Sequence, residues 1–84
     1  MKNKVLVKVY VPSIDEEYEI YIPTNESIKK VLELIVKSVY DLSDSNLDQE
    51  AKHYILDPDT STTYTNDLIV RDTNIKNSKK VILV

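Results

Sequence analysis

A change of hydrophobic period within the first half of the sequence limits this chain most strongly. Residues 4–11 (KVLVKVYV) and 18–22 (YEIYI) alternate along the chain in the way a half-buried β-strand does. The turn-forming stretch PSIDEE (12–17) separates them, so together they predict a β-hairpin. From residue 28 to residue 42 the apolar period is that of an α-helix. A hairpin followed by an amphipathic helix predicts an α+β protein whose helix covers one face of a sheet.

The second half of the chain adds three shorter strands. We expect them near residues 53–57, near 61–65 and at the final KVILV, which makes the order ββαβββ with one helix. Eighty-four residues fit a single domain spanning 1–84, with an unfolding free energy of about 4–13 kcal/mol. The residues expected in its core are Val7, Val9, Val31, Ile35, Leu68, Ile75 and Leu83.

Composition excludes several classes of site. The absence of cysteine rules out a thiolate metal site or a cysteine nucleophile. The absence of glycine rules out glycine-rich phosphate loops, and it leaves Asn or Asp for any turn with positive φ. A net charge of −3 argues against non-specific nucleic-acid binding. No apolar run approaches the roughly 20 residues of a membrane span, so we expect a cytoplasmic protein with no membrane insertion.

The sequence Asp57-Pro58-Asp59 invites a chemical interpretation, because an Asp-x-Asp spacing after a strand occurs in some phosphatases and in calcium loops. The calcium pattern needs glycine at its sixth position and glutamate at its twelfth, and here these are Thr62 and Leu68. Aspartate followed by proline is typical of the first two positions of a type I turn. We therefore predict a turn with solvated carboxylates, and neither a catalytic residue, a cofactor nor a metal. A metal-dependent hydrolase using the two aspartates remains an alternative.

The face of the sheet that the helix leaves uncovered is the candidate functional surface. Alternation places apolar side chains there, more than solubility requires, and exposed apolar patches often mark binding sites. The docking of a protein partner is the favoured interpretation, and a homodimer interface is the alternative. The predicted surface consists of Leu6, Lys8, Tyr10, Tyr21, Ile55, Ile82 and Val84.

The whole chain resembles a ubiquitin-like β-grasp domain. The resemblance begins with the hairpin, continues into the helix opening NESIKKVLELI, and is most specific in the ending LIVRDTNIKNSKKVILV. In that ending a leucine, an Asp-x-x-Ile turn and an alternating last strand correspond to Leu68, Asp72, Ile75, Val81 and Leu83. The resemblance implies a mixed sheet of four to five strands with the helix on one face, and a recognition patch on the opposite face.

The sequence departs from the conjugated members of that family. They end in a free diglycine, whereas this sequence ends at Val84 and contains no glycine, so covalent conjugation of that kind is not expected. A compact ubiquitin-like protein without the diglycine is similar to the small YukD/EsaB-type proteins of bacterial type VII (WXG100) secretion loci. The resemblance implies a non-enzymatic accessory or regulatory protein whose partner is a component of a secretion machinery.

Overall fold

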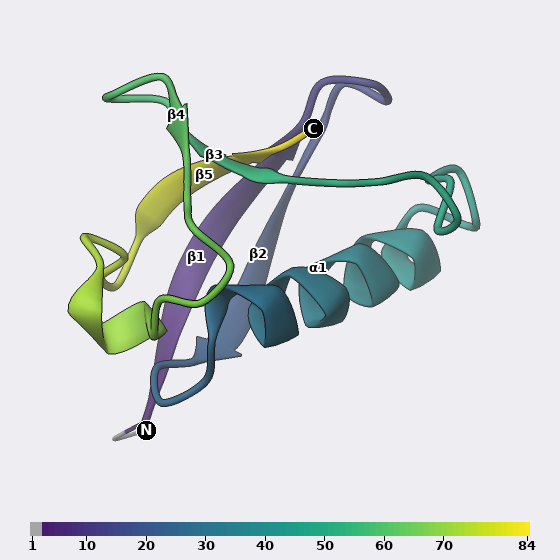
Figure 1. The fold of residues 1–84 in the computed structure, drawn as a ribbon. Coiled ribbons are helices and arrows are strands. Elements are labelled where there is room, and N and C mark those ends of the chain that lie inside the picture. The colour runs from purple at the N-terminus through teal and green to yellow at the C-terminus, as the bar shows by residue number, and fades with distance from the viewer. Residues whose placement is uncertain (1–2) are drawn as a thin grey trace.

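The computed structural model describes residues 3–84 as one mixed five-stranded sheet with a single α-helix across one of its faces (Figure 1). This is the α+β architecture and the ββαβββ order that the sequence predicts. The elements are β1 (Lys4–Val11), β2 (Glu16–Pro23), α1 (Ile28–Leu42), β3 (Ile55–Asp57), β4 (Thr62–Thr63), the 3-10 helix η1 (Val70–Asp72) and β5 (Lys79–Leu83).

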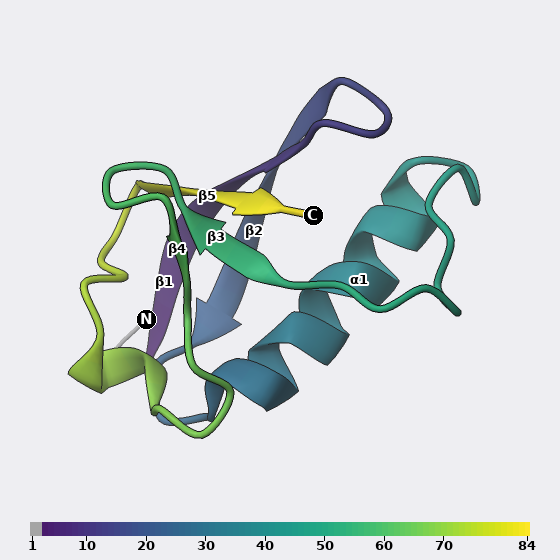
Figure 2. The same cartoon turned by 45° about the horizontal axis from the view of Figure 1, so that its top comes forward.

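The last strand lies in the middle of the sheet, whose order is β2-β1-β5-β3-β4. β1 and β2 form the predicted antiparallel hairpin, and β5 then pairs parallel to β1 on its other side. β3 pairs antiparallel to both β5 and β4. Figure 2 shows β5 between β1 and β3, with α1 crossing below the sheet. The first and last strands of the chain are therefore neighbours in the interior of the sheet.

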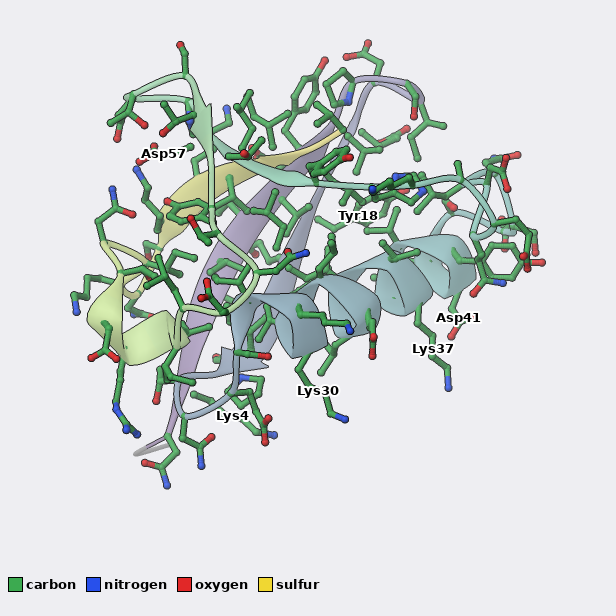
Figure 3. All side chains as sticks on the ribbon, viewed as in Figure 1. Lys4, Tyr18, Lys30, Lys37, Asp41 and Asp57 are labelled. Carbon is green, nitrogen blue, oxygen red and sulfur yellow. The ribbon has the colours of Figure 1, made fainter. Side chains whose placement is uncertain are left out.

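The helix packs through one stripe of side chains, as its period predicts. Ile28, Val31, Ile35 and Val39 are buried against the sheet, whereas Leu42 is 58% exposed. Leu42 is the last residue of the helix. On the opposite side, Lys30, Lys37 and Asp41 point away from the sheet (Figure 3).

Ser27 caps the start of the helix. Its Oγ accepts a hydrogen bond from the backbone N–H of Lys30 at 3.2 Å. Because alanine leaves that N–H without a protein acceptor, Ser27→Ala is expected to lower the free energy of unfolding by about 1 kcal/mol. Urea denaturation followed by circular dichroism measures the loss, and Ser27→Asp, which keeps a capping oxygen, should restore most of it.

The core contains six of the seven residues that the sequence assigns to it. Leu68 is the exception, because its side chain is 42% exposed. Its backbone carbonyl nevertheless accepts a hydrogen bond from the N–H of Ile28 at 2.8 Å, which ties the loop before η1 to the start of the helix. Val70, two residues later in η1, is fully buried instead. The loop therefore carries its apolar anchor two positions beyond the predicted one.

Turns in this glycine-free chain use serine as well as aspartate. Residues with positive φ in the described range are Asp15, Asp44, Ser45, Ser61 and Ser78. The expectation that aspartate or asparagine would take these positions is correct for two of the five and wrong for the three serines. Residues with a Cβ atom pay about 1–2 kcal/mol in this conformation. The fold accepts this cost at its tightest turns.

Candidate functional site

The outer face of the sheet, opposite α1, carries the side chains that alternate with the core. In β1 the valines at positions 7, 9 and 11 are fully buried, whereas Leu6, Lys8 and Tyr10 between them are partly exposed. In β5 Ile82 lies between the buried Val81 and Leu83 and is also partly exposed. These four residues therefore lie where alternation places them.

Ile55 is not part of this face, and its prediction as an outer-face residue is wrong. It is 3% exposed and belongs to the hydrophobic core, where it pairs with Leu83 in the β3–β5 ladder. The next residue, Leu56, is half-buried and pairs with Ile82. Two adjacent apolar residues satisfy either alternation, so only the pairing with β5 identifies Leu56 as the outward one.

A continuous row of side chains crosses all five strands on this face. In the pairing register, Tyr10 lies beside Glu17 of β2 on one side and Ile82 of β5 on the other. Ile82 in turn lies beside Leu56, and Leu56 lies beside Thr63 of β4. Leu6 pairs with Tyr21, which is exposed, in a second row. The centre of the sheet therefore presents an apolar strip with polar residues at both ends.

The strip continues past the end of β5. Backbone hydrogen bonds of 2.9 and 3.0 Å join Tyr54 to Val84, which extends the β3–β5 ladder by one pair. Both side chains are exposed. Val84 was predicted on this surface, whereas Tyr54 was missed, because its neighbour Ile55 was assigned to this face and alternation then placed Tyr54 on the other one. We call the set of these apolar outer-face residues the outer patch: Leu6, Tyr10, Tyr21, Tyr54, Leu56, Ile82 and Val84.

Charged groups surround the outer patch. Lys80 Nζ lies 3.3 Å from Glu17 Oε1 and 5.9 Å from the centre of the Tyr10 ring. The hydroxyl of Tyr10 donates a hydrogen bond of 2.8 Å to Asp15, and this bond raises the pKa of Tyr10. The ring of Tyr10, at the β1 end of the strip, is thus flanked by the ammonium group of Lys80 and held at its hydroxyl by Asp15.

Asp57 lies in a hydrogen-bonded network and not in a solvated loop. Its side chain is buried, and it accepts hydrogen bonds from Asn74 Nδ2 at 2.7 Å, Lys79 Nζ at 3.0 Å and the N–H of Asp59 at 3.0 Å. Hydrogen bonds from Asn74 and Lys79 lower the pKa of Asp57 to about 2. The prediction of a turn is confirmed, but the prediction of a solvated Asp57 carboxylate is wrong.

Lys79 is the cation of this network. Its Nζ bridges Asp57 Oδ1 at 3.0 Å and Asp59 Oδ2 at 2.6 Å, and hydrogen bonds to Asp59 and Asp57 raise the pKa of Lys79. Tyr64 donates a hydrogen bond of 2.6 Å to Asn74, and burial raises the pKa of Tyr64 to about 12. An ammonium group therefore lies where a metal ion would have to sit between the two carboxylates. The arrangement joins the β3–β4 turn to the start of β5.

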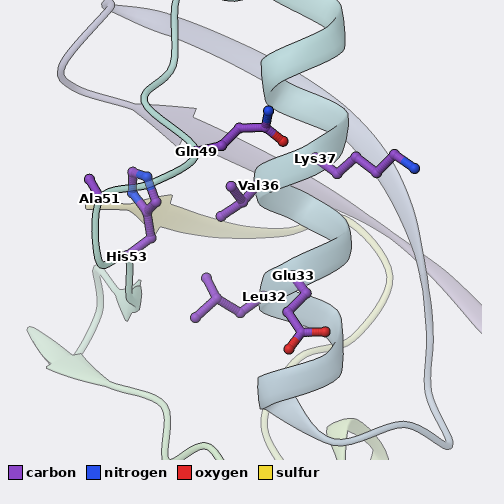
Figure 4. A pocket seen from close by; sticks show the side chains of 7 residues that line it. All are labelled: Leu32, Glu33, Val36, Lys37, Gln49, Ala51 and His53. Carbon is purple, nitrogen blue, oxygen red and sulfur yellow. The ribbon is translucent and has the colours of Figure 1, made fainter.

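A hollow of about 300 Å³ lies between α1 and the segment before β3 (Figure 4). Leu32 and Val36 of the helix face Ala51 and His53 across it. The two ring nitrogens of His53 lie 2.6 Å from the carbonyl oxygen of Asp48 and 3.2 Å from that of Val84. These contacts place the His53 ring between the segment before β3 and the end of β5.

Within residues 3–84, no group of three or more His, Cys, Asp or Glu side chains is arranged so that it could hold a metal ion. The same part of the chain has no helix with the length and apolar character needed to cross a membrane.

Comparison with known proteins identifies the fold but no close relative. No protein-family model and no curated protein matches the sequence. Among solved structures, the ubiquitin-like domain of the type VII secretion system protein EccD1 from Mycobacterium tuberculosis matches with a TM-score of 0.75 and 11% identity, over 96% of this chain and 97% of that one. The ubiquitin-like domain of EccD5 from Mycobacterium xenopi matches with a TM-score of 0.71 and 11% identity, over 96% and 92%.

The same architecture also occurs in an enzyme complex. A chain of a toluene 4-monooxygenase HD complex, with the inhibitor 4-bromobenzoate, matches with a TM-score of 0.75 and 11% identity, over 95% of each chain. These likenesses confirm the predicted ubiquitin-like β-grasp fold, including its five-stranded mixed sheet. Because identity is so low, they establish the fold alone.

Proposed function

We propose that this chain is a non-enzymatic interaction module, which binds a protein partner in the cytoplasm through the outer patch. The observation that carries the proposal is the apolar strip formed by Tyr10, Ile82 and Leu56 in adjacent strands. Its residues are only partly covered by the chain itself, and a protein partner would remove them from water. The ubiquitin-like domains of type VII secretion proteins share this fold, which supports a partner in such a machinery.

The test is affinity capture from a lysate of the source cells with three baits: the wild type, Ile82→Asp and Leu34→Asp. Ile82→Asp puts a charge at the centre of the strip, and we expect it to weaken binding by roughly 30-fold or more, the effect of losing an interface hot spot of about 2 kcal/mol. Leu34 is an exposed helix residue on the other side of the molecule, so Leu34→Asp should retain the partner.

The stability of each bait must be known, because a destabilised variant also loses partners. Ile82→Asp should unfold cooperatively in urea close to the wild-type midpoint. Equal capture by all three baits would exclude the outer patch as the binding surface. If the captured partner is unrelated to secretion, the binding module stands and the secretion assignment fails.

Self-association is the alternative use of the same surface. Light scattering coupled to size-exclusion chromatography distinguishes self-association from the binding of a different protein. A homodimer formed through the outer patch would have twice the monomer mass, and the Ile82→Asp variant would be a monomer. We expect a monomer, which leaves the patch free for a different protein.

A further inference from the structure

Two lysines lie side by side on the outer face of the sheet, next to residues of the outer patch. Lys8 of β1 and Lys80 of β5 are direct partners in the parallel ladder. Both side chains project from the outer face, because they alternate with the buried Val7, Val9 and Val81. Like charges on directly opposite residues disfavour strand pairing. The pairing of Lys8 with Lys80 therefore does not stabilise the sheet.

Of these two cations, only Lys80 forms an ion pair within the part of the chain that the structure describes. Glu17 pairs with Lys80 at 3.3 Å. Glu19 is the cross-strand partner of Lys8, yet among residues 3–84 no carboxylate oxygen lies within 4.0 Å of Lys8 Nζ. Asp15, at the adjacent turn, accepts the hydroxyl of Tyr10 at 2.8 Å. Among residues 3–84, Lys8 therefore forms no ion pair, although Glu19 lies opposite it across the β1–β2 ladder. Lys8 is half-buried and lies between Leu6 and Tyr10 along the outer face of β1.

Cations and apolar groups are mixed closely on this surface. Lys80 lies over the ring of Tyr10, and Lys52 lies over the ring of Tyr54 at 5.7 Å from its centre. A carboxylate that binds Lys8 and Lys80 would consequently lie close to Tyr10, which belongs to the apolar strip. Rim charges of this kind act mainly on partner choice and on the rate of association.

We propose that the partner segment that docks on the outer patch carries a carboxylate beside its apolar anchor, so that the carboxylate lies over Lys8 and Lys80 while the anchor contacts Tyr10 and Ile82. This inference rests on the proposed function, and it specifies the chemistry of the partner: an acidic, apolar protein segment. It also assigns Lys8, at the centre of the sheet, the role of selecting that segment.

The experiment is selection from a random peptide library displayed on phage, with wild type and Lys8→Glu/Lys80→Glu as parallel baits. Wild type is expected to enrich peptides with Asp or Glu next to apolar residues. The charge-reversed bait is expected to enrich Lys or Arg in their place. Lys30→Glu/Lys37→Glu changes the net charge by the same amount on the exposed side of α1, so it should select the same acidic peptides as wild type.

The dissociation constant of the most enriched peptide then shows how much the two lysines contribute to binding. The most enriched peptide should bind the charge-reversed variant roughly tenfold or more weakly than wild type, and added salt should narrow that difference by screening the charges. The same peptide with its acids changed to Asn and Gln should show no such preference. Lys8→Gln/Lys80→Gln removes the charges without repelling Glu17, so it should give a smaller loss and serves as the reference if the reversed variant folds poorly.

The outcomes separate this inference from the proposed function. Peptides that lose binding to Ile82→Asp but carry no acidic enrichment would overturn the inference and leave the outer patch as a docking surface. Peptides that bind Ile82→Asp as well as wild type, or no enriched peptide at all, would count against both.

Discussion

Ile55→Ala is expected to lower the free energy of unfolding by about 2–5 kcal/mol, the cost of removing most of a buried isoleucine side chain from a packed core. That is a large share of the roughly 4–13 kcal/mol available to a domain of 84 residues. Ile55 belongs to the hydrophobic core and is the cross-strand partner of Leu83 in β5. Its truncation therefore leaves a cavity where β3 meets β5. Urea denaturation followed by circular dichroism measures the change.

Leu56→Ala is the matched control, one residue along the same strand. Its side chain lies on the outer face and is half-buried, so we expect a loss of about 1 kcal/mol or less, together with weaker partner binding. If Leu56→Ala were the more destabilising of the two, the register of β3 against β5 would be wrong, and with it the composition of the outer patch.

Asp57→Asn is expected to change how stability depends on pH. Hydrogen bonds lower the folded-state pKa of Asp57 to about 2, from an ordinary value of 3.8. A lowered pKa means that the ionised carboxylate stabilises the fold above the unfolded-state value, and that this contribution is lost as the pH falls toward about 2. The wild type should therefore be more stable than Asp57→Asn near neutral pH, and the difference should shrink as the pH falls from about 4 to about 2.

The test is to measure the urea denaturation midpoints of the wild type and of Asp57→Asn between about pH 4 and about pH 2. The other carboxylates titrate in both proteins, so their contribution to stability cancels when one midpoint is subtracted from the other. Asp59→Asn is the control: its carboxylate contacts the same Lys79, but its side chain is 78% exposed, so solvent screens the pair and the effect should be small. Parallel pH profiles for wild type and Asp57→Asn would contradict the assigned role of the buried carboxylate.

Local patterns in the sequence predicted most of the fold, because they are visible within a few residues. The alternation of β1, the hairpin with β2 and the buried stripe of α1 all follow from the spacing of apolar side chains. Asp57 illustrates the same point for a turn, since its short polar side chain accepts a hydrogen bond from the backbone N–H two residues away.

The errors occur where a residue's position depends on a distant part of the chain. Leu68 and Val70 are both apolar, and only the packing of η1 under the helix start decides which of them is buried. The solvation of Asp57 was misjudged for the same reason, because its partners Asn74 and Lys79 come from another loop and from β5.

The sequence by itself determined the architecture and the composition of the β1 part of the candidate surface. Tertiary structure alone decided that Leu56 and not Ile55 faces outward, that Tyr54 joins Val84, and that Lys8 lies beside Lys80. The physical reason is that side-chain period is a local property of a strand, whereas its register is set by hydrogen bonds to a strand far away in the sequence. A shift of one residue in that register exchanges the two faces of the sheet, so the alternation within β3 could not identify the binding surface there.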